Sequence, residues 1–176
     1  MKDLYDYTAS NNNRSLLSAI KDTLSNYACV FLCVGSDKVT GDCLGPLTGQ
    51  LLTKDYNVNA YIYGTLEKPI TAQNLVFAES FIRKKHRTCK IVTIDASLGK
   101  IQDVGNIKIL NSGLMPGLAL NQTLPVVGDF SITATVNFGN SSDSSLLFST
   151  SLCVVYRLAQ TIAYAVSEFI NEKNTR

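Results

Sequence analysis

The chain has 176 residues, of which 45% are hydrophobic and 17% are charged, and its formal net charge at pH 7 is +2. This length is enough for a full hydrophobic core, so we expect residues 1–176 to form a single domain. The small net charge and the scattered basic residues do not favour a nucleic-acid partner. No apolar run reaches the ~18 residues that a membrane-spanning helix needs, so no membrane partner is expected.

The thiols and the single histidine bear on compartment and metal binding. Five cysteines without paired spacing do not form a disulfide framework. One histidine gives little support to a zinc site. The polar residues 1–13 lack the apolar core of a secretion signal. We therefore expect a cytoplasmic protein with reduced thiols, and we predict neither a cofactor nor a resident metal.

Helices and strands alternate through the first half of the chain. Apolar residues spaced at i, i+4 predict helices, and short apolar runs predict strands. In order, we expect a helix from Asn12 or Asn13 to about 25, a strand at 28–34, a helix at 43–54 with Pro46 in its first turn, a strand at 59–63, a helix at 71–85 capped by Thr71, and a strand at 90–94. Right-handed crossovers between such units make the strands parallel. The run at 28–34 has no alternation, which is typical of a strand covered on both faces.

The second half follows a different pattern, and residues 1–10 show none. A short strand is expected at 106–110, followed by a loop at 111–125. Residues 131–138 alternate between apolar and polar side chains, which predicts a strand with one polar face, antiparallel or near an edge. After a polar link at 140–145, a helix is expected at 145–171. Its apolar centre predicts deep burial or contact with a partner chain, and a homodimer is therefore one expectation.

Three carboxylates follow the first three predicted strands. Asp42 lies in the glycine-rich loop 35–45, Glu67 lies in the loop after the second strand, and Asp95 ends the third strand. The carboxyl ends of parallel strands share one edge of a sheet, so these acids could meet in one crevice. Two close carboxylates do not easily both ionise, and the pair can then act as general acid and general base. The same cluster could instead hold a divalent cation through oxygen ligands.

Simpler structural roles are available for most of these acids. Asp42 could cap the following helix, and Glu67 could be a solvated turn residue. Asp37 and Asp129 are typical of turns. His86, in the basic run at 83–87, is expected to be solvated at a helix end. Asp95 is harder to explain in this way, because a carboxylate that ends an apolar strand needs a partner or a role.

Several spaced motifs resemble those of the spore protease YyaC (sporulation protein YyaC) family. They are Gly35-Ser36-Asp37-x-x-x-Gly41-Asp42-x-Leu44-Gly45-Pro46, Tyr63-Gly64-Thr65-Leu66-Glu67-x-Pro69, Ile94-Asp95-Ala96-Ser97-Leu98-Gly99, and Leu124-Pro125-x-Val127-Gly128-Asp129. That family is similar to the germination protease and, more distantly, to hydrogenase maturation proteases. In the latter, the corresponding acids contact nickel in the substrate together with a histidine on a separate helix. Residues 111–125 supply no such histidine here.

The resemblance implies a fold, an activity and a set of site residues. The fold is a three-layer α/β/α domain of the phosphorylase/hydrolase-like type, with a mostly parallel sheet and an antiparallel strand. The activity is that of an endopeptidase in sporulation or germination, with a protein or peptide as substrate and the pair Asp42 and Asp95 as catalytic residues. The implied substrate pocket contains Ser36, Asp37, Gly41, Thr65, Glu67 and Asp129.

Two other function classes use the same residues. The first is a non-catalytic protein that binds a peptide or cation on a peptidase fold, because a fold does not fix a function. The second is a hydrolase that depends on a metal held by the acids.

Overall fold

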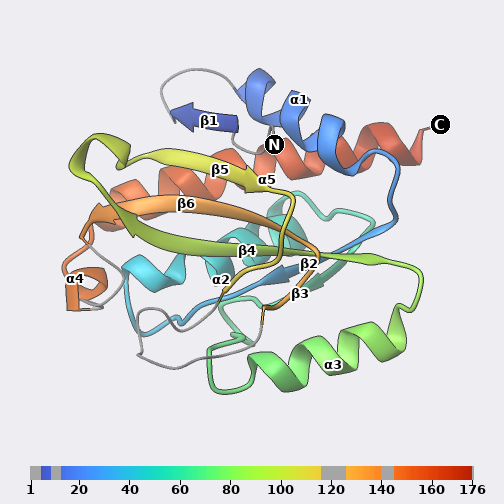
Figure 1. The fold of residues 1–176 in the computed structure, drawn as a ribbon, viewed down its shortest axis with the longest axis horizontal. Coiled ribbons are helices and arrows are strands. Elements are labelled where there is room, and N and C mark those ends of the chain that lie inside the picture. Colours follow the sequence, from blue (N-terminus) through green and yellow to red (C-terminus); the bar gives the residue numbers. More distant parts are fainter. Residues whose placement is uncertain (1–4, 9–12, 116–125, 140–144, 176) are drawn as a thin grey trace.

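The structure is a computed structural model and describes residues 5–8, 13–115, 126–139 and 145–175. One six-stranded sheet organises these residues, with helices on both faces (Figure 1). Its strands are β1 (Tyr5–Thr8), β2 (Cys29–Cys33), β3 (Tyr61–Tyr63), β4 (Lys90–Gly99), β5 (Asn106–Leu110) and β6 (Phe130–Phe138). The helices are α1 (Asn13–Leu24), α2 (Leu44–Gln50), α3 (Leu75–Lys85), α4 (Ser145–Phe148) and α5 (Leu152–Asn174).

The strand order in the sheet is β1-β5-β6-β4-β2-β3. Strands β3, β2, β4 and β6 are mutually parallel, whereas β5 pairs antiparallel with both β6 and β1. Within the described residues, β5 is thus the one strand that runs against the others. The predicted α/β class, a mostly parallel sheet with an antiparallel strand, is confirmed.

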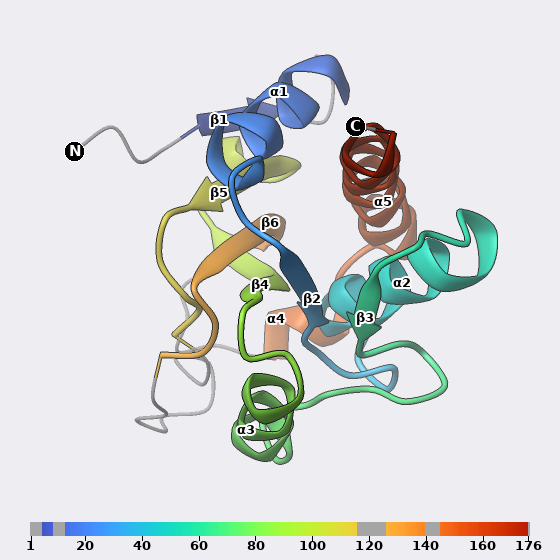
Figure 2. The ribbon, with the colours of Figure 1, turned by 90° about the vertical axis from the view of Figure 1, so that its right-hand side faces the viewer.

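The helices form two unequal layers, which makes the fold three-layered (Figure 2). On one face, α1, α2 and α5 enclose the larger core with side chains such as Leu16, Phe31 and Ile162. On the other face, α3 covers a smaller core that includes Leu32, Leu75 and Ile82. Strand β2 contributes to both cores, as its uniformly apolar sequence predicts.

The long helix predicted at 145–171 is interrupted, and this part of the prediction is wrong. Helix α4 ends at Phe148 and α5 begins at Leu152. The Ser149 and Thr150 hydroxyls donate hydrogen bonds back to the Leu146 carbonyl, at 3.2 and 3.0 Å, which satisfies the end of α4 locally. The predicted deep burial of the final helix is confirmed, since its apolar side chains fill the core between α1, α2 and the sheet. A homodimer stays a prediction.

For residues 131–138 the prediction is a strand with one polar face, antiparallel or near an edge. The antiparallel pairing is confirmed by β5, but the position near an edge is wrong. Strand β6 lies inside the sheet, parallel to β4 and antiparallel to β5. Two residues of its polar set are buried, Ser131 at 1% and Thr135 at 4% exposure. The Ser131 hydroxyl donates a hydrogen bond to the Ser112 carbonyl at 3.0 Å. This hydroxyl is therefore buried with a hydrogen-bond partner.

Two predicted helices begin or continue differently in the structure. Helix α3 starts at Leu75 rather than at Thr71, because the Asn74 side chain accepts the Thr71 N–H at 2.8 Å and closes a turn before the helix. The helix predicted at 43–54 consists of a 3-10 turn at Gly41–Cys43, α2, and a π-helical turn at Leu51–Asp55. Pro46 lies in the first turn of α2, as predicted.

Strand β4 is longer than the predicted strand at 90–94, because β6 pairs with it as far as Gly99. Asp95 is therefore inside a strand and lies opposite Thr133 of β6. Strand β2 stops opposite Ile94, so Asp95 still stands just beyond the carboxyl end of that neighbour. Strand β1 was not predicted, although Tyr5 and Tyr7 alternate with Asp6 and Thr8 over its four residues.

Some predictions fall outside the described residues. They are the helix cap at Asn12, the part of the loop at 116–125 that contains Leu124 and Pro125, and the polar link at 140–144.

Candidate active site

The loop between β2 and α2 folds back on itself at Gly35. This residue has φ +138°, and a Cβ there would lie 2.0 Å from the Asp42 carbonyl oxygen. Only glycine fits such a backbone angle and approach. The Ser36 N–H donates to that same carbonyl at 3.2 Å, which closes the loop 36–42. The loop therefore brings Asp42 back beside the carboxyl end of β2.

A second close approach, at Gly45, brings the start of α2 onto the sheet. A Cβ at Gly45 would lie 2.0 Å from the Val34 carbonyl oxygen and 2.8 Å from the Ile94 carbonyl oxygen. Gly45 comes three residues after Asp42, and Ile94 comes one residue before Asp95. The contact thus joins the chain segments that carry the two aspartates.

The two aspartates interact electrostatically. Burial raises the pKa of Asp95 well above its usual value, the charge of Asp42 raises it further, and the Ala96 backbone N–H opposes the rise. Burial also raises the pKa of Asp42, against a backbone hydrogen bond from Ser36. In the described part of the chain, neither carboxylate forms an ion pair with a Lys, Arg or His. Such a pair holds a proton more readily than an isolated surface acid.

The simpler role for Asp42 has no support in the geometry. The residue before α2 is Cys43, and no side-chain hydrogen bond caps either α2 or the preceding 3-10 turn. Burial, followed by the charges of Asp37 and Asp42, raises the pKa of the Cys43 thiol. Cys43, which the sequence did not single out, is therefore a protonated neighbour of the acids rather than an activated nucleophile.

Three of the predicted pocket residues lie in the loop that carries Asp42. Asp37 is exposed, and the Ser36 hydroxyl accepts the Lys38 N–H at 3.2 Å. Gly41 is buried, and a Cβ there would lie 2.8 Å from both Leu147 Cδ2 and Thr150 Oγ1. Helix α4 and the residues that follow it thus pack against this loop, a contact that no local sequence signal indicates.

Thr65 and Glu67 lie in the loop after β3. The Thr65 hydroxyl accepts the Lys68 N–H at 3.2 Å, which stabilises the turn. The Glu67 side chain is 63% exposed, and its carboxylate lies 3.8 Å from the ammonium of Lys54. The structure describes Glu67 as a solvated turn residue and shows no interaction between it and the two aspartates.

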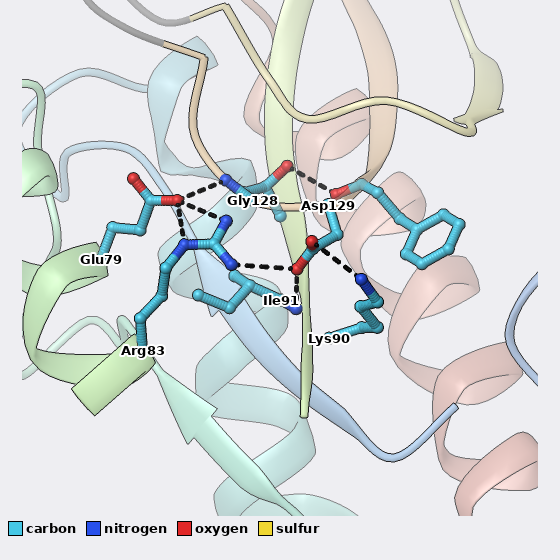
Figure 3. Close-up of polar contacts among 8 residues, drawn as sticks. Glu79, Arg83, Lys90, Ile91, Gly128 and Asp129 are labelled. Atoms are coloured by element: carbon cyan, nitrogen blue, oxygen red, sulfur yellow. Dashed lines mark hydrogen bonds and ion pairs between the residues drawn. The ribbon is translucent and has the colours of Figure 1, made fainter. Parts of the chain in front are cut away.

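Asp129 lies beside the start of β4, next to Lys90 and Ile91 (Figure 3). Its carboxylate accepts the Ile91 N–H at 2.9 Å and pairs with Arg83 at 3.3 Å and Lys90 at 3.4 Å. Ile91 precedes Asp95 by four residues, which is about 13 Å along a strand. Asp129 is therefore not brought into one pocket with Asp95, because it holds the start of β6 against the start of β4.

The sequence predicts a solvated His86, but in the structure its ring contacts two tyrosines. Its Nε2 lies 2.9 Å from the Tyr63 hydroxyl, and its ring centroid lies 4.1 Å from that of Tyr61. Burial and the charge of Lys85 lower the pKa of His86. This histidine thus packs against the edge strand β3, and it remains a structural rather than a catalytic candidate.

The described residues form neither a metal-binding cluster nor a membrane-spanning helix. No group of three or more His, Cys, Asp and Glu side chains within the described ranges could hold a metal ion. No helix in the part of the chain that the structure covers is both long and apolar enough to cross a membrane.

The fold is similar to that of a solved peptidase. The structure matches a NiFe hydrogenase maturation protease, HycI from Thermococcus kodakarensis KOD1, with a TM-score of 0.58 and 15% sequence identity. The match covers 87% of this chain and 99% of that one. At this identity the likeness concerns the fold alone, and it places the chain among proteins with a peptidase-like α/β fold.

The sequence identifies the family more directly. Residues 2–165 match the family described as "Protein of unknown function (DUF1256)", and the chain belongs to that family. It is also 32% identical, over 162 residues, to "Uncharacterized protein YyaC" of Bacillus subtilis (strain 168). That alignment covers 92% of this chain and 79% of the relative, in agreement with the resemblance that the motifs indicate.

Proposed function

We propose that this protein is a peptidase that hydrolyses peptide bonds with Asp42 and Asp95. The proposal rests on one observation, which is that two neighbouring acids both have a raised pKa and form no ion pair with a cation in the described ranges. Carboxylates that share a proton can supply an acid and a base in the same step. The peptidase-like fold supports the proposal.

The larger rise in pKa assigns the two roles. Asp95 carries the shared proton at the start, and Asp42 is ionised. Asp42 takes a proton from water as the water oxygen bonds to the substrate carbonyl carbon. Asp95 donates its proton to the amide nitrogen as the carbon–nitrogen bond breaks, and the two acids together are then restored to one shared proton. Backbone N–H groups of loop 35–45 are candidates to stabilise the oxyanion.

The biological setting is part of the same proposal. The motifs' resemblance to the spore protease YyaC family favours an endopeptidase in the cytoplasm of a spore or sporulating cell. Its substrate would be a protein or peptide of that compartment, and Ser36, Asp37, Gly41 and Thr65 would line the site beside the acid pair.

The test compares wild type with Asp42→Asn and Asp95→Asn on a fluorogenic peptide library and on unfolded casein. Both variants are expected to lose about 10²- to 10⁴-fold in kcat/KM, the usual contribution of a general acid or base. Asp55→Asn is the matched control, because it removes an exposed carboxylate from the turn after α2.

The outcomes separate the three function classes. Equal rates in wild type and both variants would contradict the acid pair. Activity that disappears with EDTA and returns with a divalent ion would favour a metal-dependent hydrolase. Thermal stabilisation by a peptide without any turnover would favour a non-catalytic binding protein.

A further inference from the structure

Strand β4 continues past its neighbour β2. The pairing of β2 with β4 ends at Cys33 and Ile94, and the last hydrogen bond on that side runs from the Val34 N–H to the Ile94 carbonyl at 2.8 Å. The chain then turns away, since the Gly35 N–H donates to the Ile70 carbonyl. From Asp95 to Gly99, β4 pairs with β6 alone (Figure 1). One side of this stretch therefore has no strand partner in the described residues.

The direction of each peptide group on β4 follows from hydrogen bonds at its two ends. In a strand, the N–H and C=O of one residue point to the same side, and the side alternates with each residue. The Lys90 N–H donates to Ala28, which precedes β2, so even-numbered residues face the β2 side. The Ile91 and Gly99 carbonyls accept from Asp129 and Gly139 around β6, so odd-numbered residues face β6.

The backbone groups of Ala96 and Leu98 consequently face the side that β2 has left. The Ala96 N–H is engaged with the Asp95 carboxylate. Since residues 95–99 pair with β6 alone, and no hydrogen bond outside the sheet pairing reaches the Ala96 carbonyl or either backbone group of Leu98, these groups are unpaired among the described residues. This edge therefore offers a carbonyl, an N–H and a further carbonyl in extended spacing, directly after Asp95.

We infer that an extended peptide binds along this side of β4 as an added strand. Unpaired groups at strand spacing are the complement of an extended peptide backbone, and peptides are recognised in this way at other open sheet edges. The groups are also continuous with the acid pair, so a strand bonded to Leu98 and Ala96 presents its next peptide group to Asp95 and Asp42. This inference deepens the proposed peptidase function and rests on it for the identity of the occupant.

The mode of binding fixes what kind of substrate is accepted. Backbone hydrogen bonds do not depend on side-chain identity, so the edge selects an unfolded or extended segment over a helix or a folded loop. The substrate is then a disordered or locally unfolded stretch of polypeptide.

The test measures amide hydrogen exchange by NMR in the Asp42→Asn protein, with and without a bound peptide. The probe is a fluorescein-labelled peptide selected from random short sequences displayed on phage. The Leu98 amide is expected to exchange at least about tenfold more slowly when the peptide is bound, the effect of one added hydrogen bond. The Ser97 amide faces β6 and serves as the internal control, with no expected change.

Peptide chemistry and one substitution provide a second readout. Alternate N–H groups of a bound strand point toward β4, and the others point away. N-methylation of the first set is expected to weaken binding of the probe about tenfold, and N-methylation of the second set is expected to leave it unchanged. Leu98→Pro, which removes the N–H, is expected to weaken binding more than Leu98→Ala, which keeps it. If Leu98→Pro does not fold, the methylation series alone decides.

The results distinguish this inference from the peptidase proposal. Alternating sensitivity to methylation without cleavage by the wild type would support the edge and refute the peptidase. Cleavage with uniform sensitivity would refute the edge alone, as would failure to select any binding peptide. Protection of Leu98 that grows with protein concentration and needs no peptide would overturn the inference, because a second copy would then cover the edge.

Discussion

Carboxylates at two points along β4 lie in opposite environments. At its start, Asp129 accepts the Ile91 N–H and pairs with Arg83 and Lys90, and these contacts lower its pKa even though burial alone would raise it. Further along, burial raises the pKa of Asp95, and the charge of Asp42 raises it further. The comparison teaches that burial does not decide the ionisation of an acid by itself. Partners of opposite charge give Asp129 a structural role at the start of β4, whereas deep burial beside a carboxylate of like charge makes Asp95 a candidate for proton transfer.

The largest expected effect on stability comes from the glycine that returns Asp42 to the strand end. Gly35→Ala is expected to destabilise the protein by about 2–5 kcal/mol, through backbone strain and the clash with the Asp42 carbonyl. Gly105→Ala is the matched control, because Gly105 also has a positive φ, of +95°, but no atom lies within 4 Å of its added Cβ. Urea unfolding measures both. Equal losses of unfolding free energy in the two variants would show that the clash with the Asp42 carbonyl does not contribute to the effect at Gly35.

At the opposite end, Asp129→Ala is expected to cost about 1–3 kcal/mol, because it leaves the Ile91 N–H without its acceptor and two cations without their partner. Asp129→Asn keeps an oxygen acceptor and removes the charge, so it is expected to lose less. Urea unfolding at neutral pH checks the order. A smaller loss for Ala than for Asn would contradict the structural role.

The pH dependence of stability should run in opposite directions for the two acids. The raised pKa of Asp95 means that its proton stabilises the fold fully below the usual value of about 3.9, and that this stabilisation is lost as pH rises through the folded pKa. The lowered pKa of Asp129 means that its carboxylate stabilises the fold above about 3.9, and that this contribution is lost as pH falls through the folded pKa.

Asp95→Asn should therefore be more stable than wild type at neutral to alkaline pH, with a difference that shrinks on acidification. Asp129→Asn should be less stable than wild type at neutral pH, with a difference that also shrinks on acidification. Urea midpoints measured across pH test both. A loss of stability in Asp95→Asn at high pH would contradict the raised pKa.

The smallest effect is expected at the third predicted acid. Glu67 is exposed and its carboxylate lies 3.8 Å from Lys54, so Glu67→Gln should change stability by less than about 0.5 kcal/mol. The Asp95 carboxyl titration, followed by carbon NMR, should not move. A clear shift would place Glu67 in the acid pair's environment after all.

The sequence predicts the layout of the sheet better than its details. The uniform apolar run at 28–34 indicates a strand between two cores, and the structure confirms it in β2. Because β2 and β4 are parallel neighbours, the loop after β2 carries Asp42 to the part of the sheet where Asp95 lies, just beyond the end of β2. Their catalytic role stays a prediction.

The features that the sequence did not predict depend on contacts between distant segments. Residues 95–99 contain Asp, Ala and Gly, which are depleted in strands, and they are extended because β6 pairs with them. The buried Ser131 belongs to a polar set that suggested solvent, but a carbonyl elsewhere in the chain satisfies it. The structural role of Asp129 was not predictable, because its partners Arg83 and Ile91 are distant in the sequence and contact it only in the folded chain.

The strand order also has a consequence for how the chain can fold during synthesis. Strand β6 is the last described strand in the sequence, yet it lies between β4 and β5 and is the strand that joins them. Until Phe138 has left the ribosome, β2, β3 and β4 can form only half of the sheet, and β1 and β5 only a separate pair. A nascent chain that stops before Phe130 therefore contains most of the strands without a means of uniting them. Assembly must wait for long-range pairing, which is the slow step in folds of this kind.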